Sequence, residues 1–170
     1  VVYGPYSVGK TYIAKELQNR LTSNHVVYLL GRLANESVHI RSIERGLDMP
    51  SGSFRTLEEA LRRVFQMSVD KHMMFIIDDY PALVDTAPQV PILLRELMET
   101  YQDYGKMFVL LMGTHVDELK GRILGESSLI APYIHSHFKV EPFTLDDVRA
   151  LGWNYTDEDL ATLYHVTGGM

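Results

Sequence analysis

A glycine-rich stretch close to the start of the chain has the residue types that bind phosphate. It reads GPYSVGKT over residues 4–11 and matches the spacing G-x-x-x-x-G-K-[ST]. Gly4 and Gly9 allow the backbone to turn sharply and to approach a ligand closely. The N–H groups of the loop and the N-terminus of a following helix would then surround a phosphate. We expect Lys10 to reach the outer phosphates of a nucleotide and the hydroxyl of Thr11 to ligate Mg²⁺.

The competing interpretation of this stretch is an ordinary glycine turn with a solvated lysine, and the surrounding sequence argues against it. The loop follows the apolar residues VVY, and Ile13, Leu17 and Leu21 come after it at the spacing of one helix face. A strand, a glycine loop and a helix in this order make a phosphate-binding unit. The residues that we expect to hold the nucleotide are Gly4, Pro5, Tyr6, Ser7, Val8, Gly9, Lys10, Thr11 and Tyr12.

Two adjacent acids supply the second candidate part of the site. They end the stretch FIIDD over residues 75–79, in which the apolar residues predict a buried strand. Ligands bind at the carboxyl ends of parallel strands, so Asp78 is placed to hold Mg²⁺ opposite Thr11, through water. Asp79 is placed to orient or activate an attacking water. The alternative is a solvated strand end without a function.

A third polar stretch, MGTHVDEL over residues 112–119, follows another apolar run. Thr114 would lie beside the phosphates and sense the outermost one through a hydrogen bond, or it would simply cap a turn. We count Lys10, Asp79 and Thr114 as the candidate catalytic residues. The letters THVD also resemble the guanine-reading motif N/T-K-x-D of GTPases, with Asp117 on the base. His115 stands where that motif has lysine, and DDYPAL lacks the glycine of a GTPase switch, so a GTPase is our third hypothesis.

Strands and helices must alternate along the chain to bring these residues together. Buried strands are predicted at residues 1–3, 25–30, 72–80, 106–114 and 135–143. Amphipathic helices are predicted at residues 9–24, 37–47, 56–67, 92–105, 144–152 and 156–169, with a capping box formed by Thr56 and Glu59. Apolar strands that alternate with such helices indicate an α/β fold with a mostly parallel sheet, covered on both faces.

Composition excludes several other classes of protein. The chain has 170 residues, of which 46% are hydrophobic and 22% charged, as in a soluble globular domain. It has no cysteine, which excludes disulfides and cysteine zinc sites and fits a cytoplasmic location. The net charge of −6 argues against unspecific attraction to nucleic acid. No apolar run is long enough to cross a bilayer, so we expect no membrane association. A start at Val1 and an end in TGGM suggest a segment of a longer protein.

The motifs, taken in order, resemble a known family. GPYSVGKT, FIIDDYPAL, LLMGTHVDEL, KVEPFTLDDV and a terminal TGG are similar to the archaeal-type P-loop ATPases, relatives of the AAA+ and STAND ATPases. The similarity runs over nearly the whole chain, and the first two motifs are its most specific part. It implies a P-loop NTPase fold, a three-layer α/β/α sandwich whose parallel sheet has strand order 5-1-4-3-2. It also implies ATP and Mg²⁺ as ligands, an ATPase core over residues 1–142 and the beginning of a helical lid over residues 143–170.

The chain departs from that family in three places. Pro5 and Tyr6 stand where the loop often has arginines, and Asp79 stands where a glutamate is usual. The family also tends to carry a YGR motif near the fifth strand, whose arginine could touch the γ-phosphate. The corresponding stretch here, IAPYIHSHF over residues 130–138, has no arginine, and Arg122 lies upstream of it.

The residues and the resemblance together predict Mg²⁺-dependent binding of ATP and its slow hydrolysis. The ATPase would act as a nucleotide switch for domains outside this segment, and DNA or protein partners would bind through those domains. The alternative is a nucleotide-binding module that hydrolyses little or no ATP. Nothing in the sequence fixes the oligomeric state.

Overall fold

A five-stranded parallel sheet forms the centre of the fold in the computed structural model. The structure describes residues 1–21, 25–33, 35–114, 120–125 and 128–168, without the side chains of residues 120 and 122. Its strands lie in the order β2-β3-β4-β1-β5, which is the expected order 5-1-4-3-2 counted from the other edge. The strand bounds are β1 (Val2–Tyr3), β2 (His25–Leu30), β3 (Met73–Asp78), β4 (Met107–Gly113) and β5 (Phe138–Lys139).

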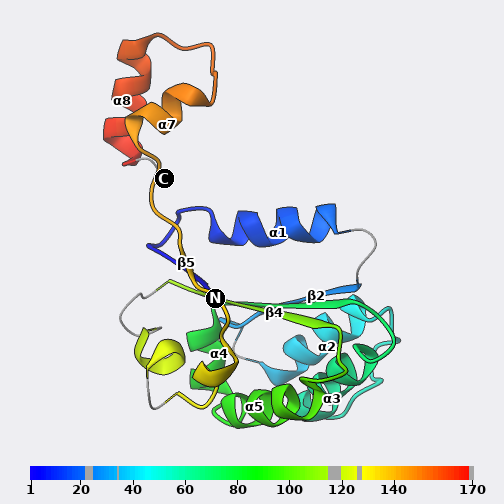
Figure 1. Cartoon of the computed structure of the whole chain (residues 1–170). Coiled ribbons are helices and arrows are strands. Elements are labelled where there is room, and N and C mark those ends of the chain that lie inside the picture. The colour runs from blue at the N-terminus through cyan, green and yellow to red at the C-terminus, as the bar shows by residue number, and fades with distance from the viewer. Residues whose placement is uncertain (22–24, 34, 115–119, 126–127, 169–170) are drawn as a thin grey trace.

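Helices cover both faces of the sheet, as Figure 1 shows. Among the described helices of the core, α1 (Lys10–Arg20) is the one that lies on the first face. The opposite face carries the other core helices, which are α2 (Glu36–Gly46), α3 (Leu57–Met67), α4 (Tyr80–Thr86) and α5 (Val90–Tyr101). A π-helical turn (Lys120–Leu124) and a 3₁₀ turn (Ala131–Tyr133) follow β4. The three-layer α/β/α sandwich expected from the sequence is therefore confirmed.

The interior strand β3, which lies between β2 and β4, supplies side chains to two hydrophobic cores. Phe75 and Ile77 belong to the larger core beneath α2–α5, whereas Met74 and Ile76 pack in the smaller core with Ala14 of α1. Side chains alternate between the two faces of a strand. Asp78 continues the alternation of Met74 and Ile76, so its carboxylate faces the side of the sheet on which α1 lies.

Helix starts follow local sequence signals, with one difference from the predicted capping box. Thr56 accepts a hydrogen bond from the N–H of Glu59 at 3.1 Å, as predicted. The carboxylate of Glu59, however, accepts from the N–H of Arg55 at 2.8 Å, so only half of the box is formed. Complete capping boxes are present instead at Thr144 and Thr156, which begin the last two helices.

The structure also differs from the sequence prediction around Asp78 and in β5. Strand β3 ends at Asp78 and not at Tyr80, because helix α4 begins there with Pro81 in its first turn, a position that tolerates proline. This short helix was not predicted. Strand β5 is also much shorter than the predicted stretch of residues 135–143, and both of its residues are exposed.

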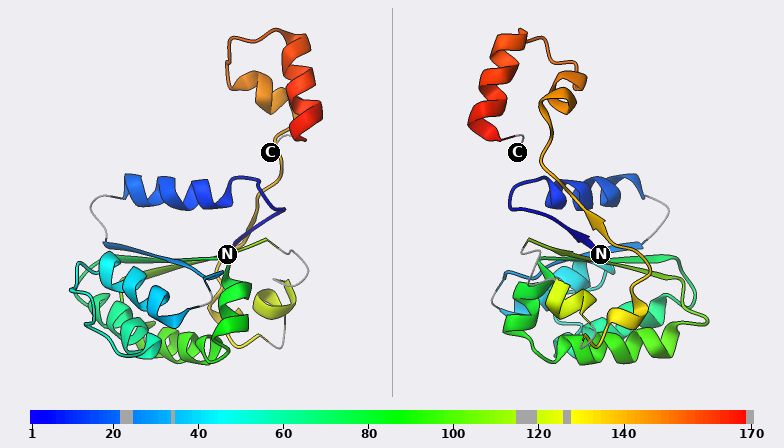
Figure 2. Two further views of the ribbon diagram at one scale, coloured as in Figure 1. Left: turned by 180° about the vertical axis from the view of Figure 1, so that it is seen from behind. Right: turned by 60° about the vertical axis from the view of Figure 1, so that its left-hand side comes forward.

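Helices α7 (Leu145–Ala150) and α8 (Asp157–Thr167) pack against each other, with Val148 and Leu160 buried. Both lie apart from the sheet, beyond α1, in the two views of Figure 2. This arrangement is compatible with a lid that begins at residue 143, and the boundary stays a prediction. Among the described helices, none combines the length and the apolar character of a membrane span.

Candidate nucleotide-binding site

The loop between β1 and α1 has a backbone suited to anions. Ser7 and Gly9 adopt left-handed conformations, with φ values of 64° and 89°. Successive residues in turn and left-handed conformations point their N–H groups into a common concavity. Gly9 is also the N-cap of α1, and no described side chain caps the N–H groups at this helix start. A residue other than glycine would be strained at φ 89°, which explains the second glycine of the motif.

The first glycine has a different structural reason. A Cβ atom at Gly4 would collide with the backbone carbonyl oxygen of Val140. Val140 follows β5, and its N–H donates a 2.7 Å hydrogen bond to the carbonyl of Tyr3. Gly4 therefore allows the phosphate-loop sequence to pass directly against the end of the neighbouring strand.

Lys10 is the first residue of α1, is 6% exposed and directs its side chain against the loop. Its ammonium group donates hydrogen bonds to the carbonyl oxygens of Gly4 at 2.9 Å and Pro5 at 2.6 Å. Burial lowers the pKa of Lys10, and the negative charges of Asp78 and Asp79 partly oppose that shift. An ammonium group has three donors, so a phosphate oxygen can be added as a further acceptor.

The carboxylate of Asp78 is joined to the loop and to the neighbouring strand. Its Oδ2 atom accepts a hydrogen bond from the hydroxyl of Thr11 at 2.6 Å and another from the hydroxyl of Tyr28 at 2.7 Å. Asp78 is only 5% exposed. Burial and, next, the bond to Asp78 raise the pKa of Tyr28, so its hydroxyl keeps its proton and remains a donor. Sequence reasoning did not single out Tyr28.

Asp79 has an unusual backbone conformation. Its φ and ψ are 61° and 53°, in the left-handed region, and it is the N-cap of α4. Aspartate is one of the few residues other than glycine that occupy this region readily. The turn separates the two acids, because Asp78 stays on the buried face of β3 and Asp79 begins the next helix.

One cavity of about 360 Å³ brings most of the predicted site together. It is lined by Tyr6, Ser7, Gly9, Lys10, Thr11, Leu30, Arg32, Asp78, Asp79 and Thr114. The other predicted loop residues, Gly4, Pro5, Val8 and Tyr12, are not among its lining residues. Tyr12 is 71% exposed on α1.

Two lining residues of this cavity were missed, namely Leu30 and Arg32 at the end of β2. The available signal was the parallel sheet itself, because the carboxyl ends of its strands meet at one edge. His115 and Asp117, on which the GTPase hypothesis depends, lie outside the described residues, and so does the side chain of Arg122.

The oxygen atoms at this cavity suit Mg²⁺. The Thr11 hydroxyl and the Asp78 carboxylate lie 2.6 Å apart, oxygen to oxygen. Mg²⁺ is usually bound by one or two protein oxygens, with substrate phosphates and water as its remaining ligands. Among the described residues, no group of three or more histidines and acids could hold a metal by itself. The donor set therefore fits an ion that is bound together with phosphate.

The chain is similar in sequence or fold to several known proteins. The chain is 22% identical over its whole length to the uncharacterized protein MJECL04 of Methanocaldococcus jannaschii and covers 37% of that protein. The fold is similar to the Aeropyrum pernix ORC1 protein in complex with DNA, with a TM-score of 0.64 and 15% identity over 95% of this chain and 42% of that one. It is also similar to the Aeropyrum pernix ORC2 protein in its ADPNP-ADP complexes, with a TM-score of 0.65 and 14% identity over 95% of this chain and 45% of that one. The chain thus spans less than half the length of each.

A family model covers most of the chain. Residues 1–132 match the ATPase family associated with various cellular activities, AAA. This range contains the glycine loop, Asp78 and Asp79 at the end of β3, and Thr114. Together with the sheet order, the match shows that the chain belongs to the AAA ATPase family and is a nucleotide-binding module of the ATPase type.

Proposed function

We propose that this chain binds ATP with Mg²⁺ and hydrolyses it slowly. The observation that carries the proposal is the contact between the two halves of the site. Thr11 at the start of α1 donates to Asp78 at the end of β3, beside the buried ammonium group of Lys10. Both halves line the same cavity of about 360 Å³.

Each part of the cavity has a role in holding the nucleotide. The N–H groups of the loop from Gly4 to Thr11 bind phosphate oxygens, and Lys10 neutralises the outer phosphates. Thr11 and Asp78 hold Mg²⁺, which when bound offsets the negative charge of the phosphates. The desolvated position of Lys10 strengthens its attraction to phosphate, because little water competes for the ammonium group.

Hydrolysis requires a water aligned with the γ-phosphorus. Asp79 lines the cavity next to Asp78 and orients this water in the proposed reaction. The water oxygen bonds to the γ-phosphorus while the bond to the bridging oxygen breaks, which yields ADP and inorganic phosphate. Thr114 lines the same cavity and donates a hydrogen bond to the outer phosphate.

Slow turnover follows from the length and position of the acid. Aspartate is one methylene shorter than glutamate, and a misplacement of about 1 Å can cost on the order of 10²-fold in rate.

Arg32 supplies a cation that sequence reasoning did not find, and we assign it to the outer phosphate. Its side chain is exposed, so solvent and salt screen its charge.

The second candidate is a module that binds the nucleotide without turning it over. The position of Asp79 at the start of α4 favours this alternative, because the helix dipole stabilises a carboxylate there whether or not it positions a water. In both cases the nucleotide state would be transmitted to domains outside this segment. DNA or protein partners are assigned to those domains, since the net charge of −6 disfavours attraction of nucleic acid here.

Calorimetry and phosphate release on the intact protein test the proposal. We expect tight binding of Mg·ATP, weaker binding of Mg·GTP and release of phosphate at below about one turnover per second. Absence of Mg·ATP binding would overturn the proposal. Tight binding without detectable release would replace the ATPase with the pseudo-ATPase, and preferential binding of GTP would favour the GTPase.

A further inference from the structure

We infer that Tyr28 is a positioning residue for the Asp78 carboxylate and sets the Mg²⁺ concentration at which the nucleotide binds. This inference rests on the proposed function, because Asp78 is its proposed metal ligand. Tyr28 belongs to β2, which carries none of the motifs that point to nucleotide binding.

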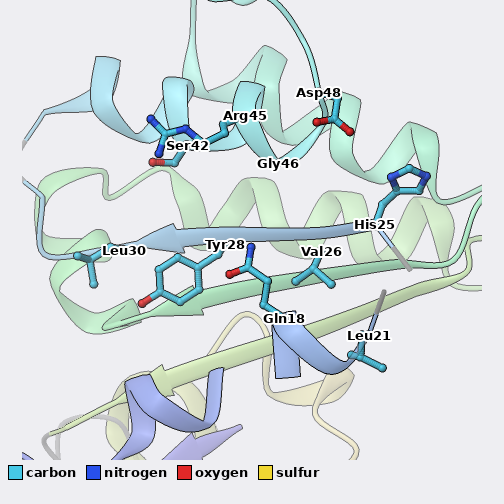
Figure 3. A pocket seen from close by; sticks show the side chains of 10 residues that line it. All are labelled: Gln18, Leu21, His25, Val26, Tyr28, Leu30, Ser42, Arg45, Gly46 and Asp48. Carbon is cyan, nitrogen blue, oxygen red and sulfur yellow. The ribbon is translucent and has the colours of Figure 1, made fainter. Parts of the chain in front are cut away.

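Strand register brings the two side chains together. In the parallel pair of β2 and β3, Tyr28 lies opposite Ile76 and Leu30 lies opposite Asp78. Tyr28 packs against the smaller core on the α1 side, which is also the face of Asp78. The tyrosine side chain has to span two residues along the strand, and strand side chains lean along the strand direction. Figure 3 shows the Tyr28 hydroxyl directed toward the C-terminal end of β2.

The two hydrogen bonds to Asp78 have different consequences when the metal binds. Thr11 and Tyr28 both donate to Oδ2, at 2.6 Å and 2.7 Å. In the proposed function the oxygen of Thr11 is itself a metal ligand, whereas the Tyr28 hydroxyl donates to the carboxylate and does not ligate the ion. The last torsion of an aspartate side chain is broad, so the carboxylate turns easily unless it is held. Tyr28 therefore fixes the direction in which Asp78 presents its oxygens to the ion and its waters.

The surroundings of Tyr28 separate this role from a packing role. Its ring is half-buried and lines a larger cavity of about 710 Å³ between α1, β2 and α2 (Figure 3). The ring can remain in place when only its hydroxyl is removed. The loss then falls on Asp78, which is 5% exposed and would have one donor fewer for its buried charge.

The direct test is Tyr28→Phe in the intact protein, with ATP affinity measured over a series of Mg²⁺ concentrations and in excess EDTA. We expect the Mg²⁺ concentration for half-maximal binding to rise by about tenfold, while affinity in EDTA stays within about twofold of the native value. Tyr101→Phe is the matched control. Tyr101 lies on α5 in an aromatic cluster with Phe65 and Tyr104, and it lines neither the nucleotide cavity nor the larger cavity beside Tyr28.

A second substitution shows whether Tyr28 acts through Asp78. On an Asp78→Asn background, Tyr28→Phe should have no further effect on the Mg²⁺ requirement. An unchanged Mg²⁺ requirement in the single variant, an equal loss of affinity in EDTA, or an undiminished effect on the Asp78→Asn background would each overturn the inference. Any of these results leaves the proposed function standing if the native protein binds Mg·ATP. Failure of the native protein to bind it would overturn both.

Discussion

The hydroxyl of Thr11 donates a 2.6 Å hydrogen bond to Oδ2 of Asp78, across 67 positions of sequence. This bond connects the helix that follows the glycine loop with the end of strand β3. It forms because Asp78 faces the α1 side of the sheet, in phase with Met74 and Ile76. The predicted roles of the residues around it can be tested one by one.

Lys10→Ala should weaken binding of Mg·ATP by at least about tenfold, or 1.4 kcal/mol. The reason is that the substitution removes the buried cation of the loop and leaves the outer phosphates without their charged partner. Calorimetry on the intact protein measures the change. Lys15→Ala, five residues further along α1 and exposed, is the control and should bind normally. Equal affinity of the Lys10 variant and the native protein would exclude the phosphate-loop assignment.

Asp78→Ala should weaken ATP binding chiefly when Mg²⁺ is present, because the carboxylate acts through the ion. Affinity measured in EDTA provides the comparison within the same variant. Asp70→Ala removes an exposed acid just after α3 and should change neither value. A loss of equal size with and without Mg²⁺ would mean that Asp78 serves only the fold.

Asp79→Asn should abolish phosphate release without weakening nucleotide binding. Asparagine keeps the shape of the side chain and tolerates the left-handed conformation, but it is a poor acceptor for the proton of the attacking water. Single-turnover phosphate release and calorimetry separate the two effects. If release continues at the native rate, another group positions the water.

Asp79→Glu should raise the rate of phosphate release, because a longer acid comes closer to the water. The structure adds a cost to this change, since glutamate is less suited than aspartate to φ 61° and stability should fall by about 1 kcal/mol. Release per folded molecule and the melting temperature should therefore move in opposite directions. A variant that releases phosphate no faster than the native protein would refute the argument from length.

Arg32→Ala should reduce affinity for ATP more than affinity for ADP, by roughly fivefold, because the side chain is assigned to the outer phosphate and is exposed. Competition titrations with both nucleotides give the ratio directly. Arg41→Ala on α2 removes another exposed arginine away from this cavity and should leave the ratio unchanged. An equal loss for ATP and ADP would place Arg32 on an inner phosphate or outside the site.

His39 should make the fold less stable in mild acid. It is 2% exposed, burial lowers its pKa from 6.5, and its Nε2 has no hydrogen-bond partner among the described residues. At pH values between the folded pKa and the unfolded pKa of His39, the unfolded chain therefore binds a proton at His39 that the folded chain does not bind. Stability should fall as pH drops below about 6.5 and level off once pH is below the folded pKa.

Urea unfolding between about pH 7 and pH 5 measures this slope, and His39→Leu should flatten it even if its stability at neutral pH differs. A native slope identical to that of the variant would show that His39 does not titrate in this way.

Much of the fold and part of the candidate site could be predicted from local patterns. The glycines at positions 4 and 9 and the apolar run before Asp78 identified the loop, strand β3 and their order. These features are local because backbone conformation and side-chain alternation depend on near neighbours. Helix α4 escaped prediction because its two turns are too short to show a clear helical period, and β5 was overestimated because an alternating pattern does not fix how much of it pairs.

The sequence alone determined which residue types the glycine loop offers to phosphate and that two acids end a buried strand. Only the tertiary structure decided that Tyr28 reaches Asp78 and that Arg32 lines the same cavity as Lys10. The position of each side chain depends on the register that sets Leu30 opposite Asp78. Register is fixed by the packing of whole strands between two helical layers, and a shift by one residue would turn Tyr28 to the other face of the sheet.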